Sequence, residues 1–270
     1  MNLSGRTILI TGGSAGIGLA FALKFLELGN DVIVTGRRQA VLDEVKAKHP
    51  KLYTLRSDVA DPAQVAALAT RVKVEFPTLD VLMNNAGISL YKSLRIPTDD
   101  LAGLMTEMNV NVGGVIRTTS AFIDILTRNR GTVINMSSAL AFVPLPCIPI
   151  YCATKAAIHS YTQSLRFQLE DTGVEVIEVM PPAVETDMTV DLSEGDGVTK
   201  ITTEELVKLS FKSLKDGVSE ILPGQAKQLA FMRRLAPNFI NRQLWKAAKK
   251  YVPTRAEAPV LGPAGASALP

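Results

Sequence analysis

The segment Thr11-Gly12-Gly13-Ser14-Ala15-Gly16-Ile17-Gly18 follows a short apolar run, Thr7–Thr11, and leads into an amphipathic stretch, Gly16–Leu28. Glycines at such a strand-to-helix turn permit a tight bend and let a pyrophosphate approach the backbone, where the N–H groups and the dipole of the helix bind it. A glycine-rich turn can also be purely structural, but a strand before it and a helix after it are the context that a dinucleotide site requires. The segment therefore predicts a dinucleotide-binding loop.

Short apolar runs and longer amphipathic stretches alternate along the chain, and most of the runs are almost continuously apolar, as is typical of strands buried on both faces. The strand candidates are Thr7–Thr11, Val32–Thr35, Leu52–Ser57, Leu79–Met83, Thr132–Met136, Val174–Met180 and Glu220–Leu222. The helical candidates are Gly16–Leu28, Ala40–Lys48, Pro62–Phe76, Asp99–Ile125, Tyr151–Glu170 and Thr203–Lys215, the last with Thr202 or Thr203 as its N-cap. This alternation predicts right-handed βαβ units and a single doubly wound parallel sheet of about seven strands, a Rossmann-type α/β domain over residues 1–223.

The composition excludes several classes of protein. With 270 residues, 47% of them hydrophobic and 20% charged, the chain is neither disordered nor collagen-like nor disulfide-stapled. Cys147 and Cys152 lack the spacing of a redox or zinc pair, and with His49 and His159 as the only histidines we expect no metal site. The chain shows neither a signal peptide nor an apolar run of the length of a membrane span. We therefore expect a soluble cytoplasmic protein with reduced thiols.

The C-terminal part is basic, although the whole chain carries a net charge of only +3. Residues 224–255 contain eight basic residues and no acid, so the rest of the chain is mildly acidic. Two helical stretches are expected there, Gln225–Ala236 and Asn238–Tyr251, separated by Pro237. The tail, residues 256–270, is rich in Ala, Gly and Pro and is expected to be disordered.

The apolar stripes of these two stretches suggest three roles for residues 224–255. An amphipathic basic helix pair can lie on an anionic membrane surface. It can also pack over a substrate cleft or a neighbouring subunit and leave its charges in solvent. Nucleic-acid contact is not expected, because the acidic body offers no broad basic face. We favour a lid or an interface over the membrane.

The choice of cofactor depends on the residues that follow the second strand candidate. An acid that binds an adenosine ribose 2′-hydroxyl belongs about 20 residues after the glycine loop. This chain has Gly36, Arg37 and Arg38 there, and no carboxylate is nearby. Guanidinium groups suit a 2′-phosphate, so we expect NADP(H), although two solvated charges at a helix start are the alternative.

Tyr151 and Lys155 lie four residues apart and therefore on one face of a helix. An ammonium near a phenol favours the phenolate, so the pair is expected to lower the pKa of Tyr151 and to suit it for proton transfer to a carbonyl oxygen or from an alcohol. Such a pair is weak evidence by itself, since most are ordinary helix surface.

The surrounding motifs give the pair a context, because together they resemble the short-chain dehydrogenase/reductase family, in its group with subunits of about 250 residues, over roughly Leu3–Leu222. The matched elements, all in family order, are the glycine loop, Asp58-Val59, Asn84-Asn85-Ala86-Gly87, Asn111, Ser138, Tyr151-x-x-x-Lys155 and Pro181-Pro182-Ala183-Val184-Glu185-Thr186. The Pro-Pro pair and Glu-Ile-Leu-Pro-Gly-Gln near the C-terminus are similar to the oxidoreductases linked to bacterial D-alanylation operons.

The resemblance implies a role for each matched residue. Tyr151 would be the acid/base, Ser138 would hydrogen-bond the substrate oxygen, and Lys155 would bind the nicotinamide ribose. Asn111, rather than the nearby Asn109, would hold a water that links Lys155 to solvent. The implied cofactor-binding residues are Gly12, Ser14, Ala15, Gly16, Ile17, Gly18, Arg37, Arg38, Asp58, Val59, Asn85, Ala86, Gly87, Tyr151, Lys155, Pro181, Val184 and Thr186.

The chain departs from the family pattern at two positions. Pro182 stands where the family has glycine, which stiffens that loop next to the nicotinamide. Ala15 stands where many NADP-dependent members carry a basic residue, so recognition of a 2′-phosphate would depend on Arg37 and Arg38.

We therefore expect an NADP(H)-dependent carbonyl reductase or alcohol dehydrogenase. Two other functions are weighed against it: a catalytically silent NADP(H)-binding regulator, and a sugar epimerase or dehydratase, whose family pattern has a differently spaced loop. The expected substrate walls are Ser89–Tyr91, Leu140–Cys147 and Met188–Val198, with Ser138, Leu140, Phe142, Leu145, Tyr151 and Met188 as contacts. Their apolar character favours a lipophilic ketone or secondary alcohol. The resemblance also implies a homodimer or homotetramer through the helices Asp99–Ile125 and Tyr151–Glu170.

Overall fold

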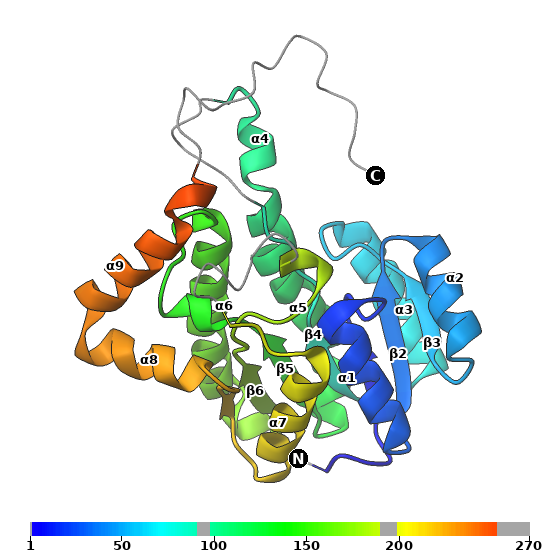
Figure 1. Cartoon of the computed structure of the whole chain (residues 1–270). Coiled ribbons are helices and arrows are strands. Elements are labelled where there is room, and N and C mark those ends of the chain that lie inside the picture. The colour runs from blue at the N-terminus through cyan, green and yellow to red at the C-terminus, as the bar shows by residue number, and fades with distance from the viewer. Residues whose placement is uncertain (1, 91–97, 190–198, 253–270) are drawn as a thin grey trace.

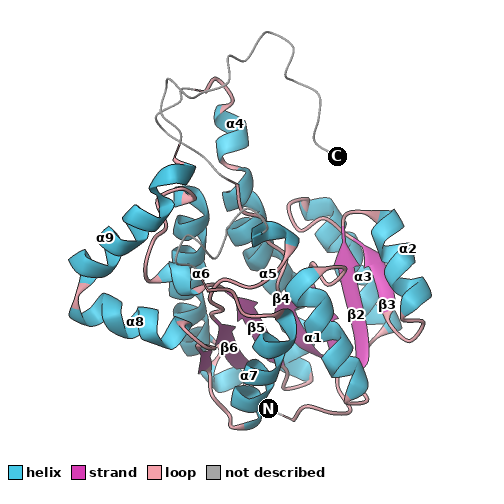
Figure 2. Ribbon diagram, viewed as in Figure 1, coloured by secondary structure: helices cyan, strands magenta, loops and turns pink. Residues whose placement is uncertain are grey.

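The computed structural model describes residues 2–90, 98–189 and 199–252 and has a parallel sheet at its centre (Figures 1 and 2). The sheet has seven strands in the order β3-β2-β1-β4-β5-β6-β7. Their bounds are β1 Thr7–Ile10, β2 Asp31–Gly36, β3 Tyr53–Arg56, β4 Leu79–Asn84, β5 Thr132–Met136, β6 Glu175–Val179 and β7 Glu220–Ile221. Every strand pair is parallel. The predicted Rossmann-type sheet is confirmed, and the predicted strands match to within one or two residues.

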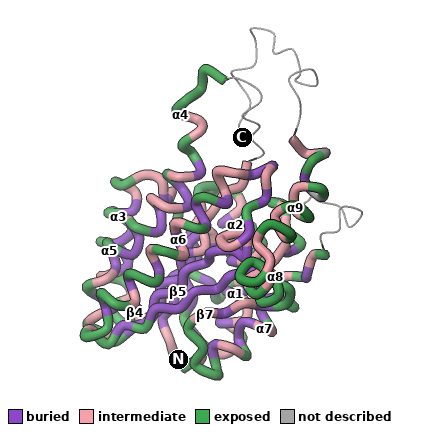
Figure 3. The backbone as a smooth tube through the Cα atoms, turned by 90° about the vertical axis from the view of Figure 1, so that its left-hand side faces the viewer, coloured by how far each residue is buried: buried purple, intermediate pink, exposed green. Residues whose placement is uncertain are grey.

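Helices cover both faces of this sheet, so its strands are buried on both sides, as the purple tube of β4 and β5 shows in Figure 3. One face packs against α1 (Gly16–Glu27), α2 (Gln39–Lys48) and α7 (Thr203–Lys215). The other packs against α3 (Pro62–Glu75), α5 (Gly114–Arg128) and α6 (Pro149–Gln168). The core of the first face includes an aromatic cluster in which the ring centroids of Phe25 and Phe211 are 4.7 Å apart. Each face of the apolar sheet is thus covered by a layer of helices, as a doubly wound fold requires.

The strand order reverses direction between β1 and β4, and this places the carboxyl ends of the two strands at a crevice. Ligands of open α/β sheets bind at such a switch point. The backbone N–H of Thr11 donates to the carbonyl of Met83 at 3.0 Å, which ties the first turn of the chain to the end of β4. The crevice is therefore lined by the glycine loop on one side and by the segment after β4 on the other.

The expected helix over Asp99–Ile125 is wrong in one respect, because the structure divides it. A short helix α4 (Leu101–Leu104) is followed by a π-helical turn, Met108–Gly113, and only then by α5. The Asn111 amide Nδ2 donates to the Ile88 carbonyl at 2.9 Å and to the Thr154 hydroxyl at 3.0 Å, and its Oδ1 accepts from the Ile88 N–H. These contacts stabilise the wider turn, and π-turns inside helices often mark functional sites.

The C-terminal part forms a helical hairpin beside the sheet, coloured orange in Figure 1. It consists of α8 (Ala226–Leu235) and α9 (Pro237–Ala248), followed by a short 3₁₀ turn, Lys249–Tyr251. The separation by Pro237 is as predicted, because a proline is tolerated in the first turn of a helix but not in its interior. Thr202 caps α7 by accepting from the N–H of Glu205 at 3.1 Å. The expected tail, residues 256–270, and Arg255 lie outside the described residues.

Candidate active site

The glycine loop is locked to the end of β4 by the side chains of Thr11 and Asn85. The Thr11 hydroxyl accepts from the N–H groups of Asn85 and Ala86, both at 3.1 Å, and the Asn85 amide donates to the carbonyls of Thr11 and Gly12, both at 3.1 Å. Gly12 has a φ of +65°, and a Cβ there would lie 2.8 Å from the Cα of Ala86. Only glycine fits this position, since the conformation is unfavourable for other residues and the space is filled by backbone.

The helix after the loop begins at Gly16 without a capping side chain. Its N-cap is Ala15, which makes no side-chain hydrogen bond to the first turn. The first N–H groups of a helix have no partner within the helix and attract anions. Because no capping side chain engages them here, these groups of α1 fit a pyrophosphate.

The predicted cofactor residues all line two adjoining cavities that share Gly12, Ala86 and Gly87. One cavity is lined by Ser14, Arg37, Arg38, Asp58 and Val59 among others. The other is lined by Ala15, Gly16, Ile17, Gly18, Asn85, Tyr151, Lys155, Pro181, Val184 and Thr186 among others. The structure thus brings together residues from six segments of the chain in one cleft that runs across the carboxyl end of the sheet.

Arg37 and Arg38 lie at one end of this cleft. Both residues are exposed, and neither forms an ion pair with a residue that the structure describes. A Cβ at Gly36 would lie 2.8 Å from the Ser14 hydroxyl, so the acid of NAD-binding loops would not fit at this position without movement of Ser14. Asp58 is engaged locally, with its carboxylate accepting from the Ala60 N–H at 2.9 Å.

Tyr151, Lys155 and Ser138 meet at the other end of the cleft. The Lys155 ammonium lies 5.5 Å from the centroid of the Tyr151 ring and donates to the Met136 carbonyl at 2.9 Å. Tyr151 and Ser138 line the same end of the cleft. Two groups for proton transfer and one cation thus surround a single point, as general acid–base chemistry requires.

Burial is the largest influence on the pKa values of Tyr151 and Lys155. It raises the pKa of Tyr151 above its ordinary value, an effect that the Ser138 hydrogen bond opposes and the nearby Cys152 and Glu107 reinforce. It lowers the pKa of Lys155 to about 8. The expectation that Lys155 lowers the pKa of Tyr151 is not met in this structure, because desolvation of the phenolate is the larger effect.

Asn111 lies behind Lys155, where the π-helical turn holds it. A Cβ on Gly87 would lie 3.3 Å from the Asn111 Oδ1 and 3.7 Å from the Lys155 Nζ, so these side chains and the Gly87 backbone meet in one small space. Asn109, which the sequence analysis set aside, is placed elsewhere and accepts from the Arg117 guanidinium at 2.6 Å.

A third cavity opens from Ser138 and Tyr151 toward the helical hairpin. Its described lining consists of Ser89, Ser138, Ala139, Leu140, Leu145, Ile148, Tyr151, Pro182, Ala183, Met188, Thr189, Thr199, Gln225, Leu229 and Leu244. No Asp, Glu, Lys or Arg occurs among these described residues. Five of the six predicted substrate contacts line it, whereas Tyr91 and most of the predicted wall Met188–Val198, residues 190–198, lie outside the described residues.

Phe142 is the exception among those contacts, and its assignment to this wall is corrected. It does not line the cavity; its ring makes an edge contact with His159 at a centroid distance of 4.8 Å, and its carbonyl accepts from Arg233 Nε at 3.1 Å. The chain bends into a 3₁₀ turn at Ala139–Ala141, which directs Leu140 and Phe142 to different sides. The apolar character of the run Leu140–Cys147 predicted a cavity wall, but it could not show that the chain bends there.

The hairpin, expected from the sequence to be a lid or an interface, contributes side chains to this cavity that were not among the expected substrate contacts. Leu229 of α8 and Leu244 of α9 line it, and α9 also packs Ala248 against the core around Leu145 and Cys152. The apolar stripes of the two helices indicated a covered face, packed over a substrate cleft or a neighbouring subunit, but did not show which residues would reach the cavity. Cys152 is buried, and burial raises the pKa of its thiol to about 11.

Pro182, the departure from the family pattern, lies at the junction of the cofactor and substrate cavities. The carbonyl of Pro181 accepts from the Ala139 N–H at 2.9 Å, which ties this loop to the turn after Ser138.

Among the described residues no group of three or more His, Cys, Asp or Glu side chains is arranged to hold a metal ion. In the same part of the chain, no helix has both the length and the apolar character needed to cross a membrane.

Comparison with known proteins places the chain in one family. The model of the short chain dehydrogenase family matches residues 6–197. The chain is 42% identical over 224 residues to the uncharacterized oxidoreductase DltE of Bacillus subtilis, covering 82% of this chain and 89% of that protein. It is 30% identical to the NADP-dependent 3-hydroxy acid dehydrogenase of Schizosaccharomyces pombe, covering 82% and 86%.

A solved structure agrees with these sequence matches. A short chain dehydrogenase from Burkholderia cenocepacia, crystallised in complex with NADP, superposes with a TM-score of 0.80 at 28% identity and covers 90% of this chain and 99% of its own. The likeness to DltE supports the subgroup that the Pro-Pro loop indicated. The chain therefore belongs to the short-chain dehydrogenase/reductase family, a family of oxidoreductases that bind a nicotinamide cofactor.

Proposed function

We propose that the protein is an NADP(H)-dependent oxidoreductase that interconverts a lipophilic ketone and its secondary alcohol. The observation that carries this proposal is the junction of two cavities at Ser138 and Tyr151. The cofactor cleft ends there, and the cavity toward the hairpin begins there. A carbonyl held at this junction would face both the cofactor and the proton donor.

The residues at the junction supply positioning and a proton. A bound nicotinamide supplies or accepts the hydride. The Ser138 hydroxyl would donate a hydrogen bond to the substrate oxygen, and the Tyr151 hydroxyl would donate its proton to that oxygen as negative charge develops on it. In the reverse direction the Tyr151 oxygen would take the proton from the alcohol. The raised pKa of Tyr151 keeps it protonated at neutral pH, which suits reduction of a ketone.

The preference for NADP(H) is supported by the two guanidinium groups at the adenosine end. Arg binds a phosphate in a planar, two-pronged geometry, and Arg37 and Arg38 follow directly on β2. The relative from Schizosaccharomyces pombe is named as NADP-dependent, and the Burkholderia structure contains NADP. Both agree with the proposal.

The lipophilic character of the substrate is supported by the side chains of the third cavity. Six leucine, isoleucine and methionine side chains line it together with alanine and proline, and its described lining has no charge to hold a carboxylate or phosphate. We also propose that α8 and α9 act as the lid of this cavity, since Leu229 and Leu244 form part of its wall.

A panel of ketones of rising chain length, assayed with NADPH and NADH in parallel, tests this function. We expect oxidation of NADPH with aromatic or long-chain ketones and much slower oxidation of NADH. No turnover of any ketone or alcohol, together with tight NADPH binding, would instead favour the silent regulator. Preference for a charged or sugar substrate would contradict the apolar cavity.

We also propose a cytoplasmic homodimer or homotetramer. The helices α5 and α6 expose Ile116 and Phe167, which are 43% and 76% accessible, and a second subunit would cover such apolar residues. Light scattering at micromolar concentration checks this, and a monomer would contradict it.

A further inference from the structure

A charged residue lies in the middle of strand β6. Glu178 is completely buried, with 0% of its surface accessible. Its neighbours Ile177 and Val179 belong to the core on the α1 side of the sheet, and Val176 belongs to the core on the α6 side. Because side chains alternate along a strand, Glu178 shares the α6 side with Val176.

Both carboxylate oxygens of Glu178 are engaged. The Ser137 hydroxyl donates to Oε1 at 2.5 Å, and Nδ1 of His159 lies 2.9 Å from Oε2. A buried carboxylate is tolerated only where charges or hydrogen bonds compensate the loss of water. The carboxylate therefore joins two elements, the turn after β5 and helix α6.

These contacts lie directly behind the catalytic residues. Ser137 precedes Ser138, and Met136, one residue earlier, offers its carbonyl to the Lys155 ammonium. Lys155 and His159 are four residues apart on α6, so they lie on the same face of that helix. The charge of Glu178 raises the pKa of Lys155 and thus opposes the burial that lowers it to about 8.

His159 connects the carboxylate to the surface. Its side chain is 19% accessible, and its Nε2 lies 3.2 Å from the amide nitrogen of the exposed Gln163. Glu178 raises the pKa of His159, chiefly through their hydrogen bond, and burial opposes this. The other charged groups that act on the ring are Glu220 of β7, which raises its pKa, and Arg166 of α6, which lowers it.

We propose that Glu178 is a positioning residue for the reaction: its carboxylate fixes the Ser137–Ser138 turn, next to the Met136 carbonyl that binds the Lys155 ammonium, and His159 holds the carboxylate in place from the solvent side. The role rests on the proposed function for Lys155, which must be a cation to assist Tyr151 and to hold the cofactor. It differs from a purely structural role, because a structural residue would leave the acidity of Lys155 unchanged.

The substitution Glu178→Gln keeps the shape of the side chain and removes its charge. Loss of a nearby anion makes a cationic group easier to deprotonate, so the pKa values of Lys155 and His159 should both fall, by about one unit for a charge at this range. Glu175→Gln is the matched control, because it removes a charge from an exposed position on the same strand.

The first measurement needs no substrate. The chain has two histidines, so proton–nitrogen NMR spectra of His159→Asn assign the ring signals of the wild type by difference. We expect the pKa of His159 to fall in Glu178→Gln and to stay unchanged in Glu175→Gln. An unchanged pKa of His159 in Glu178→Gln would contradict the contact itself.

The second measurement is the affinity for NADPH, followed by fluorescence from about pH 7 to pH 10, a range that brackets the pKa of Lys155. The affinity should fall as Lys155 loses its proton, and in Glu178→Gln this fall should begin about one pH unit lower. If a ketone substrate is found, the loss of reductase activity at high pH should move in the same direction. A fall at the same pH in both proteins would overturn the proposal.

If Glu178→Gln does not fold, the pair Glu178→Asp and Glu178→Asn replaces it. The two side chains have the same length and differ in charge, so only the Asn variant should show the shift, and equal behaviour of the two would overturn the proposal. Failure of the proposed reductase function is distinguishable, because the wild type would then bind NADPH with this pH dependence and turn over no ketone.

Discussion

The cleft has two walls of different construction. The wall formed by β1, β2 and the glycine loop consists mainly of backbone and small residues. The wall formed by α6, α8 and α9 consists of apolar side chains from distant segments of the chain. The first wall is held by hydrogen bonds such as those of Thr11 and Asn85. The second is held by packing of Leu244 and Ala248 over Leu145. A wall made of backbone leaves little freedom of sequence, whereas packing accepts many combinations of apolar residues.

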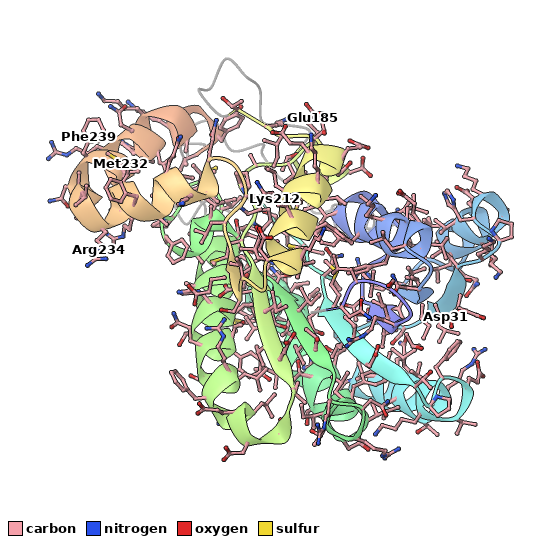
Figure 4. All side chains as sticks on the ribbon, turned by 90° about the horizontal axis from the view of Figure 1, so that it is seen from below. Asp31, Glu185, Lys212, Met232, Arg234 and Phe239 are labelled. Atoms are coloured by element: carbon pink, nitrogen blue, oxygen red, sulfur yellow. The ribbon has the colours of Figure 1, made fainter. Side chains whose placement is uncertain are left out.

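The outer side of the hairpin, which faces away from the cavity, carries exposed apolar side chains. Figure 4 shows Phe239, Met232 and Arg234 on the α8–α9 hairpin, at a distance from the sheet. Phe231 and Leu235 are 61% and 64% accessible, so this surface is held by no packing within the described chain. The outer side of the hairpin thus has apolar surface left for other contacts.

The strongest test of the comparison concerns Tyr151, where the two walls meet. Tyr151→Phe removes the hydroxyl and keeps the ring, so proton transfer is lost and the cavity stays apolar. We expect kcat to fall by about 10²–10⁴-fold, as is usual for loss of general acid–base catalysis, and NADPH affinity to stay nearly the same.

Steady-state kinetics with fluorescence titration of NADPH measures both effects. The far-ultraviolet circular dichroism of the variant should match that of the wild type, which controls for folding. A variant that keeps more than about a tenth of the kcat would remove Tyr151 from the role of acid.

The second prediction concerns the wall made of backbone. Gly12→Ala forces a side chain into a left-handed conformation and against the Cα of Ala86 at 2.8 Å, so the loop must move. We expect about a 100-fold loss of NADPH affinity, because the strain and the displaced loop act together. Isothermal titration calorimetry measures the affinity.

Gly29→Ala is the matched control for this substitution. Gly29 has a φ of +80° and nothing within 4 Å of the added Cβ, so it shares the strain and lacks the clash. It should lower the Tm and leave the NADPH affinity unchanged. Equal losses of affinity in both variants would show that strain alone, rather than the shape of the loop, explains the effect.

The contrast between the two walls also explains what could be predicted from the sequence. The glycine loop, the strand–helix alternation and the Thr202 cap each depend on a local rule, and the structure agrees with all three. The division of Asp99–Ile125 by a π-helical turn could not be predicted, because it depends on contacts of Asn111 with Ile88 and Thr154, which are distant in sequence.

The same reason applies to the candidate site. The cofactor residues form motifs and were predicted together. The helices of Leu229 and Leu244 were expected to form a lid or an interface, but no pattern showed which of their side chains would reach the substrate cavity. Glu178 was hidden in a strand that reads as apolar, and its partners lie 19 and 41 residues away. An acid inside an apolar strand is a signal in itself, since buried carboxylates need compensating partners.

The third prediction separates the two cofactors. Arg37→Ala should weaken NADPH binding by about 10- to 100-fold, the range expected for loss of one hydrogen-bonded charge pair, and should change NADH binding little. Fluorescence titrations with both cofactors measure the ratio, and Arg38→Ala is the matched variant at the next position. Equal weakening of NADPH and NADH by Arg37→Ala would show that Arg37 does not bind the 2′-phosphate.

The last prediction concerns the wall made of side chains, where we expect the smallest effect. Leu244→Ala removes a contact of α9 from the substrate cavity, and burial of a methylene group contributes about 0.8 kcal/mol. Because Leu244 is only partly buried, we expect KM for a lipophilic ketone to rise about 3- to 10-fold, with NADPH affinity unchanged. Leu235→Ala is the control, since Leu235 lies on the same hairpin, is 64% accessible and does not line the cavity. A lid predicts a larger rise in KM for long-chain ketones than for short ones in Leu244→Ala alone. If both variants instead leave KM unchanged and Leu235→Ala alters the mass measured by light scattering, the hairpin serves as a subunit interface and the lid is excluded.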